Sequence, residues 1–189
     1  GGKKVVPIFI DRIQDRRGKT IFNSDKRKCE GCKIVDTDRD PDFIPEIIDN
    51  LEQVISIETA YQITSMLEGV VKRGTGKKLK NLNVPLAGKT GTTNDNFDAW
   101  FIGSTSDLTI GVYIGYDQPR SLGKYETGSK AALPIFKKFI ESAIYKEEMK
   151  NFRAPKTISF FPIDYDTGKN VTFVEPKSIV EAFKENSLE

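Results

Sequence analysis

The sequence predicts an α+β fold in which an antiparallel sheet is flanked by helices. Three strand-like segments, 84–93, 99–103 and 108–116, follow one another with short links between them. Short links favour antiparallel neighbours, because parallel strands need a long crossover connection. Two amphipathic helix patterns, 56–72 and 131–144, supply apolar faces that need a sheet to cover. The chain of 189 residues is long enough to enclose a core of its own.

A β-hairpin is predicted at the start of the chain. Residues 5–13 are rich in isoleucine and valine, 15–18 have turn composition, and 20–22 return as the partner strand. Residues 23–49 are crowded with charge and lack periodicity, so we expect them to form an irregular insertion.

The first helix is expected over residues 56–72. Ser56 is a suitable N-cap, and Gly74 suits the left-handed position that follows many helix C-termini. Apolar residues recur at three- and four-residue spacing along one face, namely Ala60, Ile63, Met66, Leu67, Val70 and Val71.

The second helix is expected over residues 131–144, where Pro134 is tolerated near the first turn. Beyond it, 158–161 and 171–174 flank a turn at 166–168 and predict a C-terminal hairpin. Residues from Pro176 onward are expected to be helical or frayed. We divide the chain into a domain at 1–152 and a C-terminal tail at 153–189, which carries this possible hairpin.

The composition excludes several kinds of chemistry. The chain has no histidine, which rules out a Ser-His-Asp triad, a Cys-His pair and imidazole metal sites unless another chain supplies them. Lysine is the usual substitute base for acyl transfer. Twenty-nine basic and 27 acidic residues give a net charge of +2, so nothing demands nucleic acid as a partner. No apolar run is long enough for a transmembrane segment, and no cofactor or metal is expected.

The segment Ala-Gly-Lys-Thr-Gly-Thr-Thr at 87–93 is the most informative motif. A strand here would present Lys89 and Thr90 on opposite faces, because side chains alternate along a strand. Gly88 and Gly91 carry no side chain that would block another backbone from approaching. Backbone N–H groups left bare in this way can hold a carboxylate or a developing oxyanion. The tripeptide alone is also compatible with a solvated turn.

An aromatic pair, Trp100-Phe101, follows the motif on the second predicted strand of the sheet. The aromatic and β-branched residues from there to Tyr116 are most simply core residues of the sheet, so we expect both rings of the pair to be buried. Trp100 could also border an active cleft, but sheet packing explains it without one.

Two cysteines form a second candidate site, Cys29-Glu-Gly-Cys32. Without histidine they cannot complete a four-ligand zinc site in one chain. A structural disulfide that ties a loop is the simplest interpretation, and it fits a compartment outside the cytoplasm. The basic residues at 26–28 and 33 would lower the thiol pKa, which leaves a redox role open.

Alternating aspartates at 36–42 resemble the opening of a calcium-binding loop. Pro41 replaces the required glycine, and Ile47 replaces the glutamate at the twelfth position. A solvated acidic loop is therefore expected, and no metal site.

A set of ordered motifs extends over residues 56–140. They are Thr59-Ala60-Tyr61, the run 66–71, Gly74-Thr75-Gly76, the run 87–95, the run 98–103, Gly115-Tyr116-Asp117 and the run 126–134. Together they resemble the C-terminal half of the transpeptidase domain of class A penicillin-binding proteins, the bifunctional peptidoglycan synthases. The start, Gly1-Gly2 with Pro7 and 15–19, resembles the segment that follows the second catalytic box of that family.

The resemblance implies a penicillin-binding protein/β-lactamase-like transpeptidase fold, incomplete in this chain, and the crosslinking of peptidoglycan stem peptides. It implies that Lys89 and Thr90 bind the substrate carboxylate and that Lys89 aids proton transfer as a catalytic residue. The backbone N–H of Thr92 would form half of an oxyanion hole, its hydroxyl would join the group that binds the carboxylate, and Gly91 would keep the strand edge open. β-Lactams would be ligands. The full-length protein would lie in the periplasm, anchored in the inner membrane, with a glycosyltransferase module upstream.

The sequence departs from the family pattern at the nucleophile. The boxes Ser-x-x-Lys and Ser-x-Asn should precede Lys-Thr-Gly, yet neither occurs between Gly1 and Ala87. A Ser-x-x-Lys at Ser121 follows it instead, in a segment of loop composition. We therefore expect a fragment that is inactive alone and needs the missing N-terminal part of the same polypeptide.

Two alternatives stay open. One is a non-catalytic periplasmic binding module that meets a partner through residues 23–49. The other is a serine β-lactamase-like hydrolase, although the long match after Lys-Thr-Gly argues against it.

Overall fold

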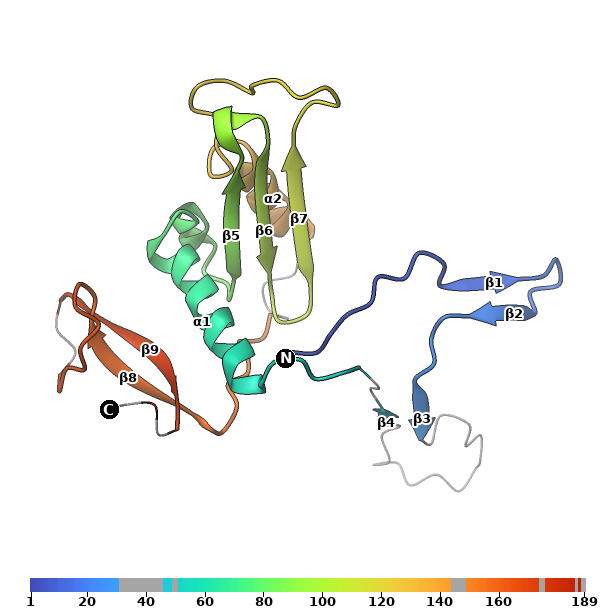
Figure 1. The fold of residues 1–189 in the computed structure, drawn as a ribbon, viewed down its shortest axis with the longest axis horizontal. Helices are drawn as coiled ribbons and strands as arrows, with labels where there is room; N and C mark the ends of the chain where they lie inside the picture. The colour runs from blue at the N-terminus through green and yellow to red at the C-terminus, as the bar shows by residue number, and fades with distance from the viewer. Residues whose placement is uncertain (31–45, 49–50, 144–148, 174–175, 186, 188–189) are drawn as a thin grey trace. The chain divides into compact units, whose positions relative to one another are not determined.

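The computed structural model describes residues 1–30, 46–48, 51–143, 149–173, 176–185 and 187 (Figure 1). The chain divides into two compact units, residues 2–56 and residues 57–189 with Gly1. Each unit is considered by itself. The expected boundary near residue 152 falls inside the larger unit, and it stays a prediction.

The larger unit is built on a three-stranded antiparallel sheet. Strands β5 (Ala87–Thr92), β6 (Ala99–Ser104) and β7 (Thr109–Ile114) lie in the order β5-β6-β7, as Figure 1 shows. The register runs without a bulge, from Ala87 opposite Ser104 to Thr92 opposite Ala99. The predicted antiparallel meander is therefore confirmed.

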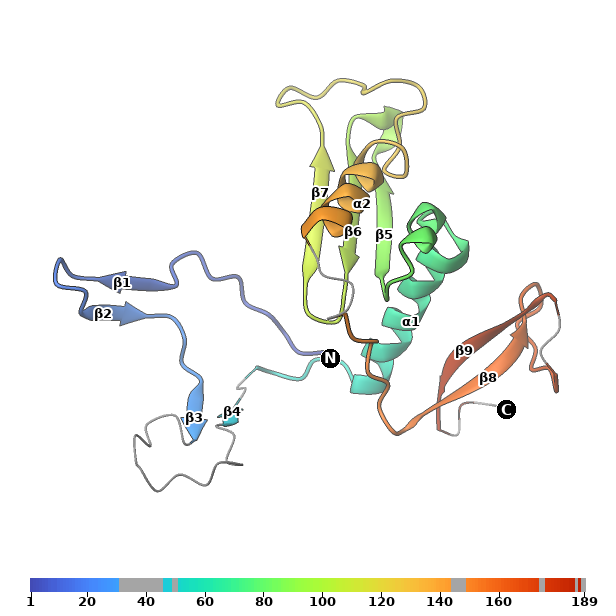
Figure 2. The same cartoon turned by 180° about the vertical axis from the view of Figure 1, so that it is seen from behind.

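Helix α2 (Ala132–Ala143) covers one face of this sheet, as the view from behind in Figure 2 shows. Phe136 from the helix and Phe101 from β6 are fully buried, and their ring centroids lie 4.8 Å apart. The predicted helix is confirmed to within one residue at each end; Ile144 lies outside the described residues. Burying these two rings contributes a large part of the apolar stabilisation of this layer.

Helix α1 (Ile57–Arg73) packs against β5 and begins directly after Ser56, as predicted. The expected role of Gly74 is wrong, since Gly74 is not among the described residues with positive φ. Instead, a Cβ at Gly74 would lie 2.9 Å from the Cα of Val70. The N–H groups of Gly74 and Gly76 both donate to the carbonyl of Val70, at 3.0 Å each. Glycine is therefore required here for close backbone approach. A 3₁₀ helix, η1 (Lys77–Leu82), follows.

Strands β8 (Ile158–Asp164) and β9 (Ser178–Lys184) form an antiparallel pair with Ile158 opposite Lys184. The predicted partner strand at 171–174 is wrong: 171–173 are not in a strand, and Val174 lies outside the described residues. The turn at Gly168 does reverse the chain, but it yields only one bridge, between Ile163 and Asn170. The segment from Pro176, expected to be helical or frayed, supplies the true partner strand.

In the smaller unit, β1 (Arg12–Gln14) pairs with β2 (Thr20–Asn23), which confirms the predicted hairpin. The first strand is shorter than the predicted 5–13, because residues 5–10 have no strand partner in the described part of the chain. A second pair, β3 (Lys28–Glu30) with β4 (Glu46–Ile48), lies inside the segment expected to be irregular.

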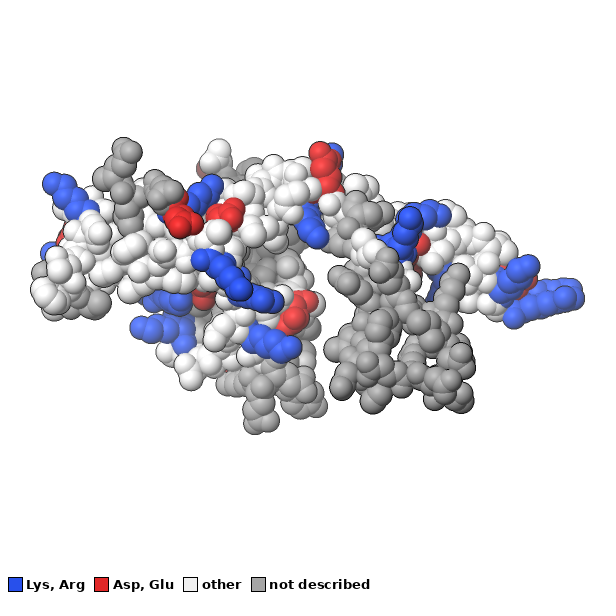
Figure 3. All heavy atoms as spheres, turned by 90° about the horizontal axis from the view of Figure 1, so that it is seen from below, with Lys and Arg blue, Asp and Glu red and all other residues white. Residues whose placement is uncertain are grey.

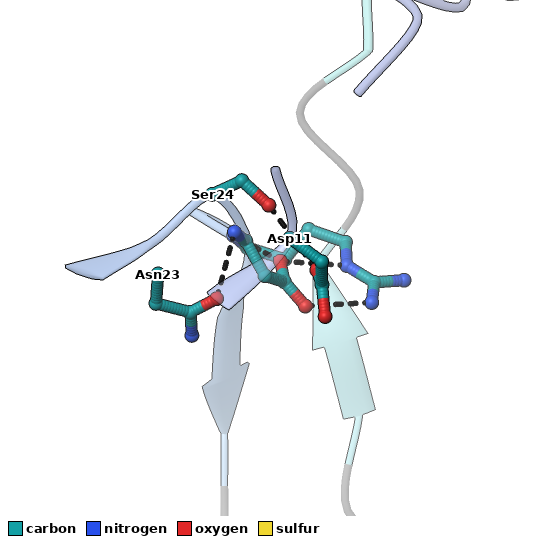
Figure 4. A network of polar contacts seen from close by, with 5 residues as sticks. Asp11, Asn23 and Ser24 are labelled. Atoms are coloured by element: carbon teal, nitrogen blue, oxygen red, sulfur yellow. Dashed lines mark hydrogen bonds and ion pairs between the residues drawn. The ribbon is translucent and has the colours of Figure 1, made fainter. Parts of the chain in front are cut away.

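Polar contacts hold the chain after β2 (Figure 4). The Arg27 guanidinium donates to both carboxylate oxygens of Asp25, at 2.9 and 2.7 Å. These bonds from Arg27 lower the pKa of Asp25 to about 2. Nearby, the Asp25 N–H donates to the side chain of Asn23, and Ser24 Oγ donates to Asp11 at 3.2 Å. Local hydrogen bonds, and not a buried core, therefore order this segment.

Candidate functional site

The Lys-Thr-Gly motif lies on β5, which forms one edge of the three-stranded sheet. Lys89 is exposed and Thr90 is half-buried. The ammonium group of Lys89 donates to the backbone carbonyl of Thr90 at 2.7 Å. The site therefore presents a cation beside the edge of a strand.

The register places Lys89 and Thr90 on opposite faces of the sheet, as the alternation predicted. Lys89 pairs with the exposed Ile102, whereas Thr90 pairs with Phe101, which packs on α2. Directly paired residues share a face of an antiparallel sheet. The Thr90 side chain thus belongs to the covered face and that of Lys89 to the open one.

The end of the motif is packed tightly by Gly128, in the segment that leads into α2. A Cβ at Gly128 would lie 2.3 Å from the carbonyl oxygen of Trp100 and 2.6 Å from that of Gly91. The Gly128 N–H donates to the hydroxyl of Thr92 at 3.1 Å. The backbone of Gly128 therefore holds Gly91 and Thr92 in place.

A residue that sequence reasoning gave no role also contacts the motif. The hydroxyl oxygen of Thr75, which follows the end of α1, lies 2.9 Å from the hydroxyl oxygen of Thr90. The motif Gly74-Thr75-Gly76 is visible in the sequence, but its contact with a residue 15 positions away is not. Thr75 thus links the turn after the helix to the edge strand.

An aromatic pair lies on the open face. The rings of Trp100 and Tyr113 have centroids 4.7 Å apart, and the Tyr113 hydroxyl donates to Asp98 at 2.9 Å. The hydrogen bond to Asp98 raises the pKa of Tyr113. The expected burial of both Trp100 and Phe101 is wrong for Trp100, which is 40% exposed, since neighbouring strand residues face opposite ways.

Ser121 lies in the loop between β7 and α2, as predicted. Its hydroxyl donates to the carbonyl of Asp95 at 2.7 Å and accepts from the N–H of Gly123 at 3.2 Å. The Lys124 ammonium lies 5.6 Å from the ring centroid of Tyr125. The two hydrogen bonds of Ser121 therefore stabilise the loop, and the Lys124 ammonium lies beside an aromatic ring instead of the serine.

The cysteine motif is only partly described. Cys29 lies in β3 opposite Ile47, but Cys32 and the acidic run 36–42 lie outside the described residues. The disulfide between Cys29 and Cys32 stays a prediction. Among the residues that the structure describes, no cluster of acidic or cysteine side chains could hold a metal ion.

The charge distribution agrees with the balanced composition. On the face drawn in Figure 3, basic side chains are interspersed with acidic ones. In the described part of the chain, no helix is long and apolar enough to cross a bilayer.

A meander with Lys-Thr-Gly on its edge strand and a helix behind it agrees with the expected penicillin-binding protein/β-lactamase-like transpeptidase fold. The model of the penicillin binding protein transpeptidase domain matches residues 1–141. The chain belongs to that family.

Its relatives include penicillin-binding proteins 1A from several bacteria. The one from Rickettsia prowazekii is 42% identical over 189 residues, which are 100% of this chain and 24% of that protein. The one from Pseudomonas aeruginosa is 34% identical over 212 residues, covering 97% of this chain and 26% of that protein. The chain therefore spans about a quarter of the length of these curated relatives.

A solved structure supports the fold. The crystal structure of penicillin-binding protein 1A from Haemophilus influenzae matches 100% of this chain and 30% of that chain, with a TM-score of 0.75. At 24% identity this likeness concerns the fold alone.

Proposed function

We propose that this chain forms the C-terminal part of a serine-type D,D-transpeptidase that crosslinks peptidoglycan stem peptides and binds penicillin. The observation that carries the proposal is the position of Lys-Thr-Gly on the edge strand β5, with its lysine, Lys89, exposed. Family membership and the name of the relatives support the same activity.

The reaction proceeds in two acyl transfers. A serine oxygen attacks the carbonyl carbon of the peptide bond before a terminal D-alanine, and the C–N bond breaks. D-Alanine leaves with the proton that the serine gave up. An amine of a second stem peptide then attacks the ester carbon, a new amide C–N bond forms, the ester C–O bond breaks, and the serine oxygen regains the proton that the amine gives up. A β-lactam forms the same ester but keeps its amine tethered.

The residues of β5 bind and orient the acyl donor. Lys89 offers an ammonium group to the terminal carboxylate, and Thr90 offers a hydroxyl; charge-assisted bonds of this kind are among the stronger ones. The backbone N–H of Thr92 stabilises the oxyanion that develops on the attacked carbonyl. Gly91 leaves the strand edge free of a side chain.

The nucleophile and its base come from residues upstream of Gly1. No Ser-x-x-Lys precedes the Lys-Thr-Gly motif, and Ser121 is engaged with Asp95 in a loop. The chain is accordingly inactive alone and acts with the N-terminal part of the same polypeptide.

We place the domain in the periplasm, where stem peptides are crosslinked, with a membrane anchor and a glycosyltransferase module upstream. A disulfide between Cys29 and Cys32 would be stable there. Detection of the protein only in the cytoplasmic fraction of cells would contradict this location.

Intact-mass spectrometry with benzylpenicillin tests the proposal. We expect no adduct on residues 1–189 alone, and one adduct, on the upstream part, when the chain is extended by the residues that precede it. In the extended protein, Lys89→Met should slow acylation about tenfold to a hundredfold, because a bond to a charged group is lost. Lys80→Met, at an exposed lysine of η1, is the matched control and should leave the rate unchanged.

Other outcomes would favour the alternatives. An adduct on residues 1–189 alone would mean that the nucleophile lies within them, with Ser121 the first residue to replace. No adduct on either protein would favour a non-catalytic periplasmic binding module. An adduct that is released within seconds as hydrolysed penicillin would favour a β-lactamase-like hydrolase.

A further inference from the structure

Thr75 contacts the Lys-Thr-Gly strand from outside the sheet. Its hydroxyl oxygen lies 2.9 Å from that of Thr90, and either atom can be the donor. Thr75 is exposed, so water could satisfy its hydroxyl as well as a protein group could. The bond to Thr90 is therefore not needed to satisfy a buried hydroxyl.

The turn that carries Thr75 is held rigidly. The N–H groups of Gly74 and Gly76, on either side of it, both donate to the carbonyl of Val70. A side chain at either glycine would meet this backbone, since a Cβ would lie 2.9 Å from Val70 Cα at Gly74 and 3.2 Å from Val70 O at Gly76. Gly76 is also buried. The turn therefore fixes the position of Thr75 relative to α1.

The helix is in turn fixed to its surroundings. Helix α1 packs against β5, and Arg73 in its last turn pairs with Glu181 of β9. The position of Thr75 therefore depends on α1 and the turn after it, and not on the hydrogen bonds between the strands of the sheet. Such support from rigid elements is what holds a binding group in its productive geometry.

We propose that Thr75 is a positioning residue for ligand binding: it donates its hydroxyl hydrogen to Thr90 and so directs the Thr90 hydroxyl hydrogen toward the ligand carboxylate. A hydroxyl has one hydrogen to donate and two lone pairs to accept with. If Thr90 accepts from Thr75, its own hydrogen stays free for the carboxylate. Donors arranged in such a chain also polarise one another and strengthen the final bond. The inference rests on the proposed function, because it needs a carboxylate ligand at Thr90.

The test uses the protein extended by its upstream residues, with benzylpenicillin as the probe. Stopped-flow acylation at rising penicillin concentration separates the dissociation constant of the first complex from the limiting acylation rate. Thr75→Val keeps the shape and removes the hydroxyl, and we expect the dissociation constant to rise about fivefold to tenfold. The limiting rate should change little, because the carboxylate is bound before and during acylation.

Three controls separate positioning from general damage. Thr75→Ser keeps a hydroxyl and should restore the dissociation constant. Thr64→Val removes a threonine hydroxyl that donates within α1, to Ala60, and should have no effect on it. In a Thr90→Val background, Thr75→Val should not raise the dissociation constant further, since the two hydroxyls act as one unit.

An unchanged dissociation constant in Thr75→Val would overturn the inference. A rise in the dissociation constant of Thr75→Ser as large as that of Thr75→Val would overturn it as well. A further rise of the dissociation constant when Thr75→Val is added to Thr90→Val would overturn it too, because Thr75 would then affect binding without acting through Thr90. If the unsubstituted extended protein takes up no penicillin, the proposed function itself fails, and this inference with it.

Discussion

Gly128, in the segment before α2, lies too close to the backbone of the sheet to leave room for a side chain. A methyl group there would lie 2.3 Å from the Trp100 carbonyl oxygen and 2.6 Å from the Gly91 carbonyl oxygen, both of them backbone atoms. Gly111 in β7 offers the opposite case, because its Cβ would meet only Ile102 Cγ1 at 4.0 Å. The two glycines make a matched pair.

We expect Gly128→Ala to destabilise the larger unit by about 1–3 kcal/mol, as forced overpacking does. Gly111→Ala should stay within about 0.5 kcal/mol of the parent chain. Urea unfolding of both variants in the chain extended upstream, followed by circular dichroism, measures the two changes, because we expect that chain to unfold cooperatively. Equal midpoints for the two variants would show that the backbone at Gly128 can move aside.

At the scale of residues, the alternation of side chains along a strand can be predicted from the sequence. It predicts Lys89 and Thr90 on opposite faces of the sheet, and the register confirms this. The same rule, applied to Trp100 and Phe101, would have exposed one of them, but aromatic character suggested burial of both. The contacts of Thr75 and Gly128 could not be predicted, because each joins segments whose approach depends on tertiary packing.

At the scale of elements, α2 shows how one helix uses two phenylalanines differently. Phe136 is fully buried against Phe101, whereas Phe139, three residues further along, is 42% exposed. Gly103 leaves the space that the Phe136 ring occupies, since a Cβ there would lie 2.6 Å from Phe136 Cζ. Phe136 therefore anchors the helix in the core together with Leu133 and Ile140, which are also fully buried, whereas Phe139 does not.

Phe136→Ala should cost about 3–5 kcal/mol of unfolding free energy, because it removes a buried ring and leaves a cavity. Phe139→Ala, with the same chemical change on the same helix, should cost less than about 1 kcal/mol, because its ring is partly in water already. Chemical denaturation of both variants in the chain extended upstream, which we expect to unfold cooperatively, measures the two losses of unfolding free energy. A comparable loss from the two would place the Phe139 ring in an interface of the folded chain in solution.

The helices and the meander, whose hydrophobic patterns are clear in the sequence, are predicted correctly. The partner of strand β8 is not. Helices α1 and α2 and the meander follow from hydrophobic periodicity and short links. The C-terminal hairpin was assigned to the wrong partner, because Gly168 ends a turn that leads to one bridge before the longer strand β9. Strand pairing depends on which distant segment completes the ladder, and local composition does not encode that choice.

At the scale of the whole molecule, much apolar surface is left uncovered among the described residues. On α1, the side chains of Ile57, Ile63 and Met66 are about half exposed. In the smaller unit, Val5 and Ile8 are mostly exposed, and Phe9 is fully exposed. Single exposed apolar residues are normal, but such gatherings mark surfaces that pack against a partner.

We therefore expect residues 1–189 alone to self-associate or to unfold with weak cooperativity, and the chain extended upstream to do neither. Light scattering after size exclusion gives the mass in solution, and calorimetry compares the calorimetric with the van't Hoff enthalpy. The dye ANS should bind the shorter chain more strongly, because the extended chain covers apolar surface that the shorter one exposes. Replacing Ile63 and Met66 of α1 with glutamine should reduce the association of the shorter chain, whereas glutamine at the exposed Lys78 of η1 should not. A sharp, monomeric, two-state transition with little dye binding would mean that the uncovered side chains close on one another and that the chain folds as a complete domain.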